Sequence, residues 1–307
     1  MLNRRHLLQA LAATSASALV PSVLAPVASA QSAPLFEISL AEWSLNRLLF
    51  DGQLSNLEFP GFARKEFGIG AVEYVNQFFM DKAEDSFYLA ELKQRCDDNG
   101  VRSVLIMCDR EGNLGDPDAA LRATAVENHY KWADAAKFLG CHSIRVNAAS
   151  SGSWDEQQKL AADGLRRLSE YAIKLGLGVI VENHGGLSSN GKWLSAVIRA
   201  VDMANCGTLP DFGNFKISED ERYDNYLGVQ ELMPFAKGVS AKSYGFDAEG
   251  NESSMDYRRL MKIVLDAGYR GHVGVEWEGR DPDQVNGVKL TKALLEKIRE
   301  EFTPQYA

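Results

Sequence analysis

Short runs of β-branched and apolar residues alternate with longer amphipathic segments along the chain from about residue 35 onward. Such alternation is typical of a parallel sheet whose strands are joined by crossover helices. The candidate strands number eight and cover residues 35–43, 70–75, 101–108, 142–148, 178–182, 208–211, 238–242 and 272–276. The helical patterns between and after them include residues 118–139, 155–175, 192–203, 255–267 and 290–302.

The residues that flank these segments support the assignment. Asp116-Pro117 precedes one helical segment and Ser153 the next, where helix starts are expected, and glycines such as Gly140 and Gly176 follow helices. A (β/α)8 barrel needs about 250 residues. We therefore predict an α/β fold, a single (β/α)8 TIM barrel over residues 31–307. The alternative is an open doubly wound sheet, which normally carries a glycine-rich phosphate loop after its first strand. No such loop follows the first strand here.

Residues 1–30 are excluded from this fold because they resemble an export signal. Arg4 and Arg5 precede a mildly apolar stretch, and an Ala-Ser-Ala triplet at 28–30 forms a cleavage pattern. The paired arginines indicate the twin-arginine route, with an ordinary secretory signal as the alternative. We therefore expect the mature protein in the periplasm, with no membrane anchor once the signal is removed.

Charge and cysteine usage exclude several classes of protein. The 42 Asp and Glu outnumber the 33 Lys and Arg, giving a net charge of −9. A chain of this charge without a basic stripe is not expected to bind nucleic acid or an anionic membrane. The four cysteines are widely scattered and show neither a CxxC pair nor a disulfide framework. We interpret all four as structural, although an approach of Cys108 to Cys141 stays open.

Acidic residues stand at the ends of three of the last four candidate strands. Glu182 follows Val-Ile-Val, Asp211 ends the sixth strand, and Glu276 ends the eighth. In a barrel such side chains point into the mouth where active sites lie. Taken singly, such a glutamate would be a helix cap or an ion-pair partner, and Asp211 could form an Asx turn. Three acids in strand-end register instead favour a shared site, where their repulsion is relieved by Mg²⁺ or Mn²⁺.

The segments Val181-Glu182-Asn183-His184, Asp211-Phe212-Gly213-Asn214 and Val275-Glu276-Trp277 resemble the sugar-phosphate isomerase/epimerase superfamily of xylose isomerase-like barrels. The resemblance extends over residues 35–302. It implies a divalent metal, Mn²⁺ or Mg²⁺ with Zn²⁺ or Co²⁺ as alternatives, held by Glu182, Asp211 and Glu276. The family's His-x-Lys pattern on strand seven reads Ser240-Ala241-Lys242 here. Lys242 therefore matches, whereas Ser240 is a weak replacement for a histidine ligand.

The same resemblance implies roles for the residues around the acids. Glu182 and Glu276 would act as base and acid on a metal-bound keto-sugar, passing through an enediolate that Lys242 could stabilise. An ion pair with the acids is the alternative role of Lys242. The residues expected to contact substrate are His184, Asn214, Arg145, Trp43 and Glu73. Trp277 is expected to be structural, and Glu278 is a candidate further acid.

The expected substrate is an unphosphorylated sugar, keto-sugar, glycoside or cyclitol, because the leader implies export and the sequence offers no phosphate-binding cluster. The predicted activity is isomerisation or epimerisation. The alternatives are a lyase that eliminates from a keto-sugar or 3-keto-glycoside, and a sugar-binding protein that lost its metal. An endonuclease on the same scaffold would need more histidines than the five present. A homo-oligomer is compatible with the sequence.

Overall fold

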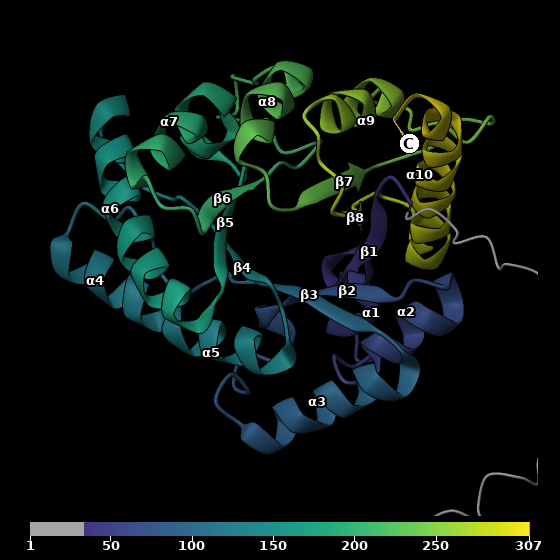
Figure 1. Cartoon of the computed structure of the whole chain (residues 1–307), viewed down its shortest axis with the longest axis horizontal. Helices are drawn as coiled ribbons and strands as arrows, with labels where there is room; N and C mark the ends of the chain where they lie inside the picture. Colours follow the sequence, from purple (N-terminus) through teal and green to yellow (C-terminus); the bar gives the residue numbers. More distant parts are fainter. Residues whose placement is uncertain (1–33, 307) are drawn as a thin grey trace, which may run out of the picture. The chain divides into compact units, whose positions relative to one another are not determined.

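The structure, a computed structural model, describes residues 34–306. The predicted signal peptide at residues 1–30 and its export route lie outside the described residues. Within them a ring of eight parallel strands lies inside a layer of helices (Figure 1). The strands are β1 (Glu37–Ala41), β2 (Ala71–Val75), β3 (Arg102–Met107), β4 (Ser143–Val146), β5 (Gly178–Glu182), β6 (Cys206–Leu209), β7 (Val239–Ser243) and β8 (His272–Trp277).

The strand order is β6-β5-β4-β3-β2-β1-β8-β7, with every strand pair parallel. Because β1 pairs with both β2 and β8, the sheet curls around into a barrel. Its last seam, between β6 and β7, is held by isolated bridges, Thr208 to Ala236 and Asp211 to Ser240. The predicted (β/α)8 barrel is therefore confirmed in a nearly closed form, and the open doubly wound sheet is excluded.

The described residues form ten α-helices, most of which lie outside the ring of strands (Figure 1). They are α1 (Asn46–Phe50), α2 (Phe59–Phe67), α3 (Ser86–Asn99), α4 (Ala119–Asn128), α5 (Tyr130–Leu139), α6 (Trp154–Ala172), α7 (Gly191–Val201), α8 (Asn225–Leu232), α9 (Tyr257–Asp266) and α10 (Gln284–Tyr306). No helix among residues 34–306 combines the length and the apolar character needed to cross a bilayer. The four cysteines are free and buried, in keeping with a structural role.

One helix prediction was wrong. The segment 118–139 was expected to be a single helix, but α4 and α5 are separated at His129. The buried His129 ring donates from Nδ1 to the carbonyl of Ala125, at 2.7 Å. The backbone N–H of His129 bonds instead to Val126, three residues back. A side chain that takes the carbonyl four residues earlier competes with the helical ladder, and the chain bends there.

The core has two parts, one on each side of the sheet. Successive side chains of a strand point alternately inward and outward. Outward residues pack against the helices in one large apolar cluster that includes Trp132 and Trp193. Inside the barrel the apolar filling is small and consists of Ala41, Ala71, Val75, Val104, Leu105, Met107, Ile180 and Leu209. Charged residues occupy inner positions toward the carboxyl ends of the strands, and these residues form the candidate site.

Candidate active site

Three carboxylates meet inside the mouth of the barrel. Glu182 is the last residue of β5, Asp211 lies two residues beyond β6, and Glu276 is on β8. Each offers an oxygen that lies within 4.8 Å of the other two, and all three side chains are buried. The predicted convergence of these acids on one site is thus present in the structure. Buried acids that crowd together in this way need a cation, a shared proton or basic neighbours.

The loop after β6 fixes the position of Asp211. Its Oδ1 accepts hydrogen bonds from the backbone N–H groups of Gly213 and Asn214, both at 2.7 Å. Its own N–H donates to the side-chain oxygen of Asn183, at 2.8 Å. One oxygen of Asp211 therefore forms the Asx turn that the sequence allowed. The other, Oδ2, is left to face β7.

Ser240 on β7 lies between two of the acids. Its hydroxyl contacts Asp211 Oδ2 at 2.9 Å and Glu276 Oε2 at 2.5 Å. A hydroxyl has one proton to donate, so the second short contact requires a proton on a carboxyl group. Burial raises the pKa of Asp211 well above its ordinary value and raises that of Glu276 as well, with Lys242 acting in the opposite direction. Without a cation, these two acids are therefore set to hold a proton between them.

Lys242 supplies positive charge on the same strand. Its Nζ lies 3.5 Å from Asp211, 3.7 Å from Glu276 and 3.3 Å from Glu278. The β7–β8 register places Lys242 directly beside Glu276. Burial alone would lower the pKa of Lys242, but the surrounding carboxylates outweigh it and the pKa lies well above the ordinary value. The ammonium is therefore charged, and Lys242 forms ion pairs with the acids, as the alternative interpretation of the sequence expected.

Arg145 on β4 holds Glu182 from the other side. The guanidinium lies 2.6 Å from Glu182 Oε2 and 3.0 Å from Asp109 Oδ1. Asn214 donates to the second oxygen of Glu182, at 2.8 Å. Burial would raise the pKa of Glu182, yet the nearby positive charge of Arg145, with help from His184 and the Asn214 hydrogen bond, brings it below the ordinary value. Glu182 is thus the most readily ionised of the three acids.

Asp109 was missed in the sequence analysis. It follows β3 by two residues, the same offset that separates Asp211 from β6. Besides Arg145 it accepts hydrogen bonds from Asn147 at 2.9 Å and Gln77 at 3.1 Å. The strand-end position was the available signal, although the partner arginine is 36 residues away along the chain.

A cavity of about 200 Å³ opens at the mouth beside these groups, and Glu276 is the member of the acid cluster that lines it. It is lined by Trp43, Val75, Gln77, Met107, Asp109, Arg145, His184, Glu276 and Glu278. Of the residues expected to contact substrate, Trp43, Arg145 and His184 line this cavity, and Asn214 lines an adjoining one. Glu73 does not line it, because its side chain lies inside the barrel. There it accepts a 2.5 Å hydrogen bond from Ser39, and burial raises its pKa to about 7.

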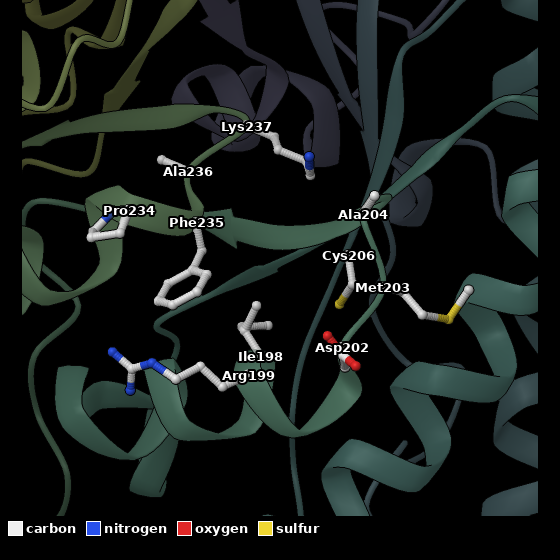
Figure 2. Close-up of a pocket in the computed structure, with 10 residues that line it drawn as sticks. All are labelled: Ile198, Arg199, Asp202, Met203, Ala204, Cys206, Pro234, Phe235, Ala236 and Lys237. Carbon is white, nitrogen blue, oxygen red and sulfur yellow. The ribbon is translucent and has the colours of Figure 1, made fainter.

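A larger cavity, of about 690 Å³, lies at the opposite end of the barrel (Figure 2). Cys206, the first residue of β6, lines it together with Lys237 just before β7, so it opens at the amino-terminal ends of the strands. The Arg199 guanidinium lies over the Phe235 ring, 5.2 Å from its centre. This cavity contains one carboxylate, Asp202, and no cluster of acids. The cluster of acids lies at the carboxyl-terminal end of the barrel, where barrel enzymes act, so this cavity is not the candidate active site.

A parallel barrel with clustered acids and a lysine at its carboxyl-terminal mouth defines a class of small-molecule enzyme scaffolds. Residues 63–301 match the family model described as xylose isomerase-like TIM barrel, so the chain belongs to this family.

Among solved structures the barrel is similar to L-ribulose 3-epimerase, with a TM-score of 0.68 and 16% identity over 87% of this chain and 95% of that one. It is also similar to 3-keto-D-glucoside 4-epimerase from E. coli, with a TM-score of 0.64 and 17% identity over 85% of this chain and 99% of that one. A third similar structure is a family barrel from Mycobacterium smegmatis in complex with magnesium, with a TM-score of 0.65 and 15% identity over 89% and 98% of the two chains. At these identities the likeness shows the fold.

Shorter stretches match curated proteins more closely. The alpha subunit of a C-glycoside deglycosidase from Arthrobacter globiformis is 35% identical over 77 residues, 23% of this chain and 22% of that protein. The alpha subunit of 3'-dehydrocarminate deglycosidase from a Microbacterium is 42% identical over 48 residues, 16% and 14% of the two chains. The matched stretches thus span less than a quarter of these relatives.

Proposed function

We propose that this chain is a divalent-metal-dependent enzyme that removes a proton beside the ketone of an unphosphorylated keto-sugar and returns it to give an isomer or epimer. The observation that carries the proposal is the buried cluster of Glu182, Asp211 and Glu276 with its oxygens within 4.8 Å of one another. Its donor atoms are hard carboxylate oxygens, the ligands that Mg²⁺ and Mn²⁺ prefer.

The surroundings of the cluster fit a cation. Asp211 Oδ2 and Glu276 Oε2 converge on a single hydroxyl, and their contacts require a proton that a cation would displace. Ser240 stands where the family places a histidine, so water would complete the coordination. Glu182, Asp211 and Glu276 would hold the metal, which would polarise the ketone oxygen of the sugar.

The chain's own residues then divide the proton transfer. Glu182, kept ionised by Arg145 and Asn214, is the base that takes the proton from the carbon beside the ketone. Glu276, on the far side of the mouth, donates a proton to the opposite face or to a leaving atom. Lys242, held between the acids, stabilises negative charge on the sugar oxygen.

The cavity argues for a neutral sugar. Among the described residues that line it, Arg145 is the sole Arg or Lys, and it is already engaged by Glu182 and Asp109. A phosphate placed there would meet carboxylates instead of free cations. Trp43 offers an apolar face, which suits the face of a sugar ring.

A second candidate is elimination from a 3-keto-glycoside. The deglycosidases that short stretches of the chain match favour this reaction. The similar 3-keto-D-glucoside 4-epimerase acts on a 3-keto sugar but is an epimerase, so it supports the type of substrate and not the elimination. Removal of the proton between the ketone and the anomeric carbon would expel the aglycone with the bonding electrons of the broken bond. The aglycone would then take a proton from Glu276. Both reactions use the same base and begin with the same proton transfer.

The test combines metal analysis with product mass. Purified protein is stripped with a chelator, reloaded with Mn²⁺, and incubated in deuterated water with a free keto-sugar and with a 3-keto-glycoside. We expect Mn²⁺-dependent deuterium uptake: an isomer differs in mass only by that label, whereas elimination also releases the aglycone. Glu182→Gln should abolish uptake, and Glu170→Gln on the outer surface of α6 serves as the matched control. Equal activity in chelator and in Mn²⁺, or full activity of Glu182→Gln, would refute the proposal.

A further inference from the structure

A half-exposed tyrosine stands at the rim of the mouth, beside the cluster of acids. Tyr244 directly follows β7 and is 38% exposed. A Cβ added at Gly213 would come within 2.5 Å of the Tyr244 hydroxyl oxygen, so the ring lies over this glycine. The glycine of the Asp-Phe-Gly-Asn segment thus makes room for the phenol next to Asn214. The site described above does not use this ring.

Two further cavities adjoin the inner one at this rim. One of about 350 Å³ is lined by His184, Asn214, Arg222 and Tyr244. The other, of about 680 Å³, is lined by Arg222, Tyr244 and Glu278 among others. His184 and Glu278 also line the inner cavity, so the three spaces meet around the mouth. The inner cavity, about 200 Å³, is smaller than the 300 Å³ or more of a typical ligand pocket, so a ligand larger than one ring would extend toward Tyr244.

Two exposed arginines stand along this rim, beside the carboxylates of Glu278 and Asp281. Arg222 lines both outer cavities and is exposed, and it forms no ion pair within the part of the chain that the structure describes. Arg280 lines the larger one and is likewise unpaired among residues 34–306. Lys216 lines the smaller one and pairs with the exposed Glu219 at 2.9 Å. An arginine beside an aromatic ring suits a planar anionic group better than a neutral sugar.

The loop that carries the tyrosine is held in place. Glu252 is buried and accepts hydrogen bonds from the backbone N–H groups of Tyr244 at 3.2 Å, Ser254 at 2.7 Å and Met255 at 2.5 Å. One carboxylate therefore ties the start of the β7–α9 loop to its end. A ring fixed in this way loses little freedom when a ligand packs on it.

We propose that Tyr244 and Arg222 form a subsite for an aromatic, negatively charged aglycone joined to the sugar in the inner cavity. The inference rests on the proposed function for the identity of that sugar. Tyr244 would pack against the aromatic ring, and Arg222 would pair with a carboxylate or phenolate on it. The substrate class would then be acidic aryl glycosides in their keto form.

Binding of inert glucosides to the Mn²⁺-loaded full chain tests this, because probes without a ketone bind and do not react. The probes are methyl, phenyl and 4-carboxyphenyl β-D-glucoside and glucose 6-phosphate, measured by titration calorimetry. We expect phenyl glucoside to bind about 5- to 10-fold more tightly than methyl glucoside. The carboxylate should add about a further 3- to 10-fold.

The variants separate the two contributions. Tyr244→Leu should reduce the phenyl-to-methyl affinity ratio toward one, and Arg222→Gln should remove the gain from the carboxylate. Tyr130→Leu, on α5 where the ring stacks on Tyr171, is the control that should keep every ratio. Phenyl and methyl glucoside binding equally to wild type would overturn the subsite alone. So would glucose 6-phosphate binding most tightly through Arg222 without Tyr244. Failure of every probe, methyl glucoside included, would also overturn the subsite, whereas the proposed function is judged separately by Mn²⁺-dependent deuterium uptake into the keto-sugar.

Discussion

Glu42 gives the most quantitative prediction. It is fully buried at the end of β1, where its two oxygens accept hydrogen bonds from Asn56 Nδ2 and from the backbone N–H of Val75, both at 2.9 Å. Burial raises its pKa to about 8, and these two hydrogen bonds reduce the rise without cancelling it. At neutral pH the folded protein therefore keeps a proton on Glu42 that the unfolded chain releases.

The sign and size follow from this difference. A carboxyl whose folded pKa is raised stabilises the fold fully below the unfolded pKa, and the contribution is lost as pH rises toward the folded pKa. The rise from 4.5 to about 8 corresponds to about 5 kcal/mol at most, lost between roughly pH 4.5 and 8. For a domain of this size the melting temperature would fall on the order of 10 °C.

The assay compares wild type with Glu42→Gln in urea unfolding from pH 5 to 8.5. A glutamine at position 42 carries no charge, and its amide group can donate to Asn56 if the Asn56 amide flips. Asn56 Oδ1 now accepts from the Tyr88 hydroxyl at 2.8 Å, and after the flip that hydroxyl can accept from the Asn56 amide instead. We expect the variant to be slightly less stable than wild type at pH 5 and to gain about 3–5 kcal/mol relative to it by pH 8.5. Glu170→Gln on α6 should track wild type. Parallel curves for wild type and Glu42→Gln would refute the reasoning.

Three further changes probe the mouth. Arg145→Met should destabilise the fold by about 3–5 kcal/mol in urea unfolding, because it leaves Glu182 and Asp109 without their buried partner. Adding Asp109→Asn should recover part of this loss, and an unchanged midpoint for the single variant would contradict the ion pair. Ser240→Ala removes the hydroxyl between two of the acids. Because the three carboxylates remain, calorimetry should show Mn²⁺ binding over nearly the same pH range as in wild type. A complete loss of binding would make the hydroxyl a required ligand. Lys242→Met should raise Mn²⁺ affinity about tenfold or more by removing a nearby positive charge, while turnover falls; weaker metal binding would count against the shared site.

The barrel and the acid cluster could be predicted from the sequence because both depend on local patterns. Alternating apolar runs and helix caps mark the eight units, and an acid at a strand end faces the mouth wherever the barrel closes. Glu182, Asp211 and Glu276 could therefore be brought together without knowing any long-range contact. Even the shift of the sixth strand, expected at 208–211 and found at Cys206–Leu209, left Asp211 at the mouth.

Other features depended on side chains that meet only in the folded chain. The break at His129 comes from one ring bonding a backbone carbonyl in the same segment. Asp109 belongs to the site because it forms an ion pair with Arg145 on the next strand. The Tyr244 ring can lie where it does because Gly213, on a different loop, has no side chain. Glu73 lies in the middle of β2, so its side chain is inside the barrel, where Ser39 is its partner. For Asp109, Tyr244 and Glu73 local spacing cannot distinguish such positions, because the decisive neighbour is far away in sequence; the His129 contact, in contrast, is local.

The seam between β6 and β7 is the most weakly hydrogen-bonded edge of the barrel, and a bound ion could stabilise it. The other neighbouring strands form ladders, whereas this edge depends on isolated bridges, with backbone bonds such as Ser240 N–H to the Pro210 carbonyl at 2.9 Å and Phe212 N–H to the Ser240 carbonyl at 3.1 Å. Asp211 belongs to one side of the opening and Glu276 to the other. An ion bound by both residues would link the two sides of this seam. Amide protons along β6 and β7 should therefore exchange more slowly when the ion is present. The same bound ion would then serve both the reaction and the stability of the closed barrel.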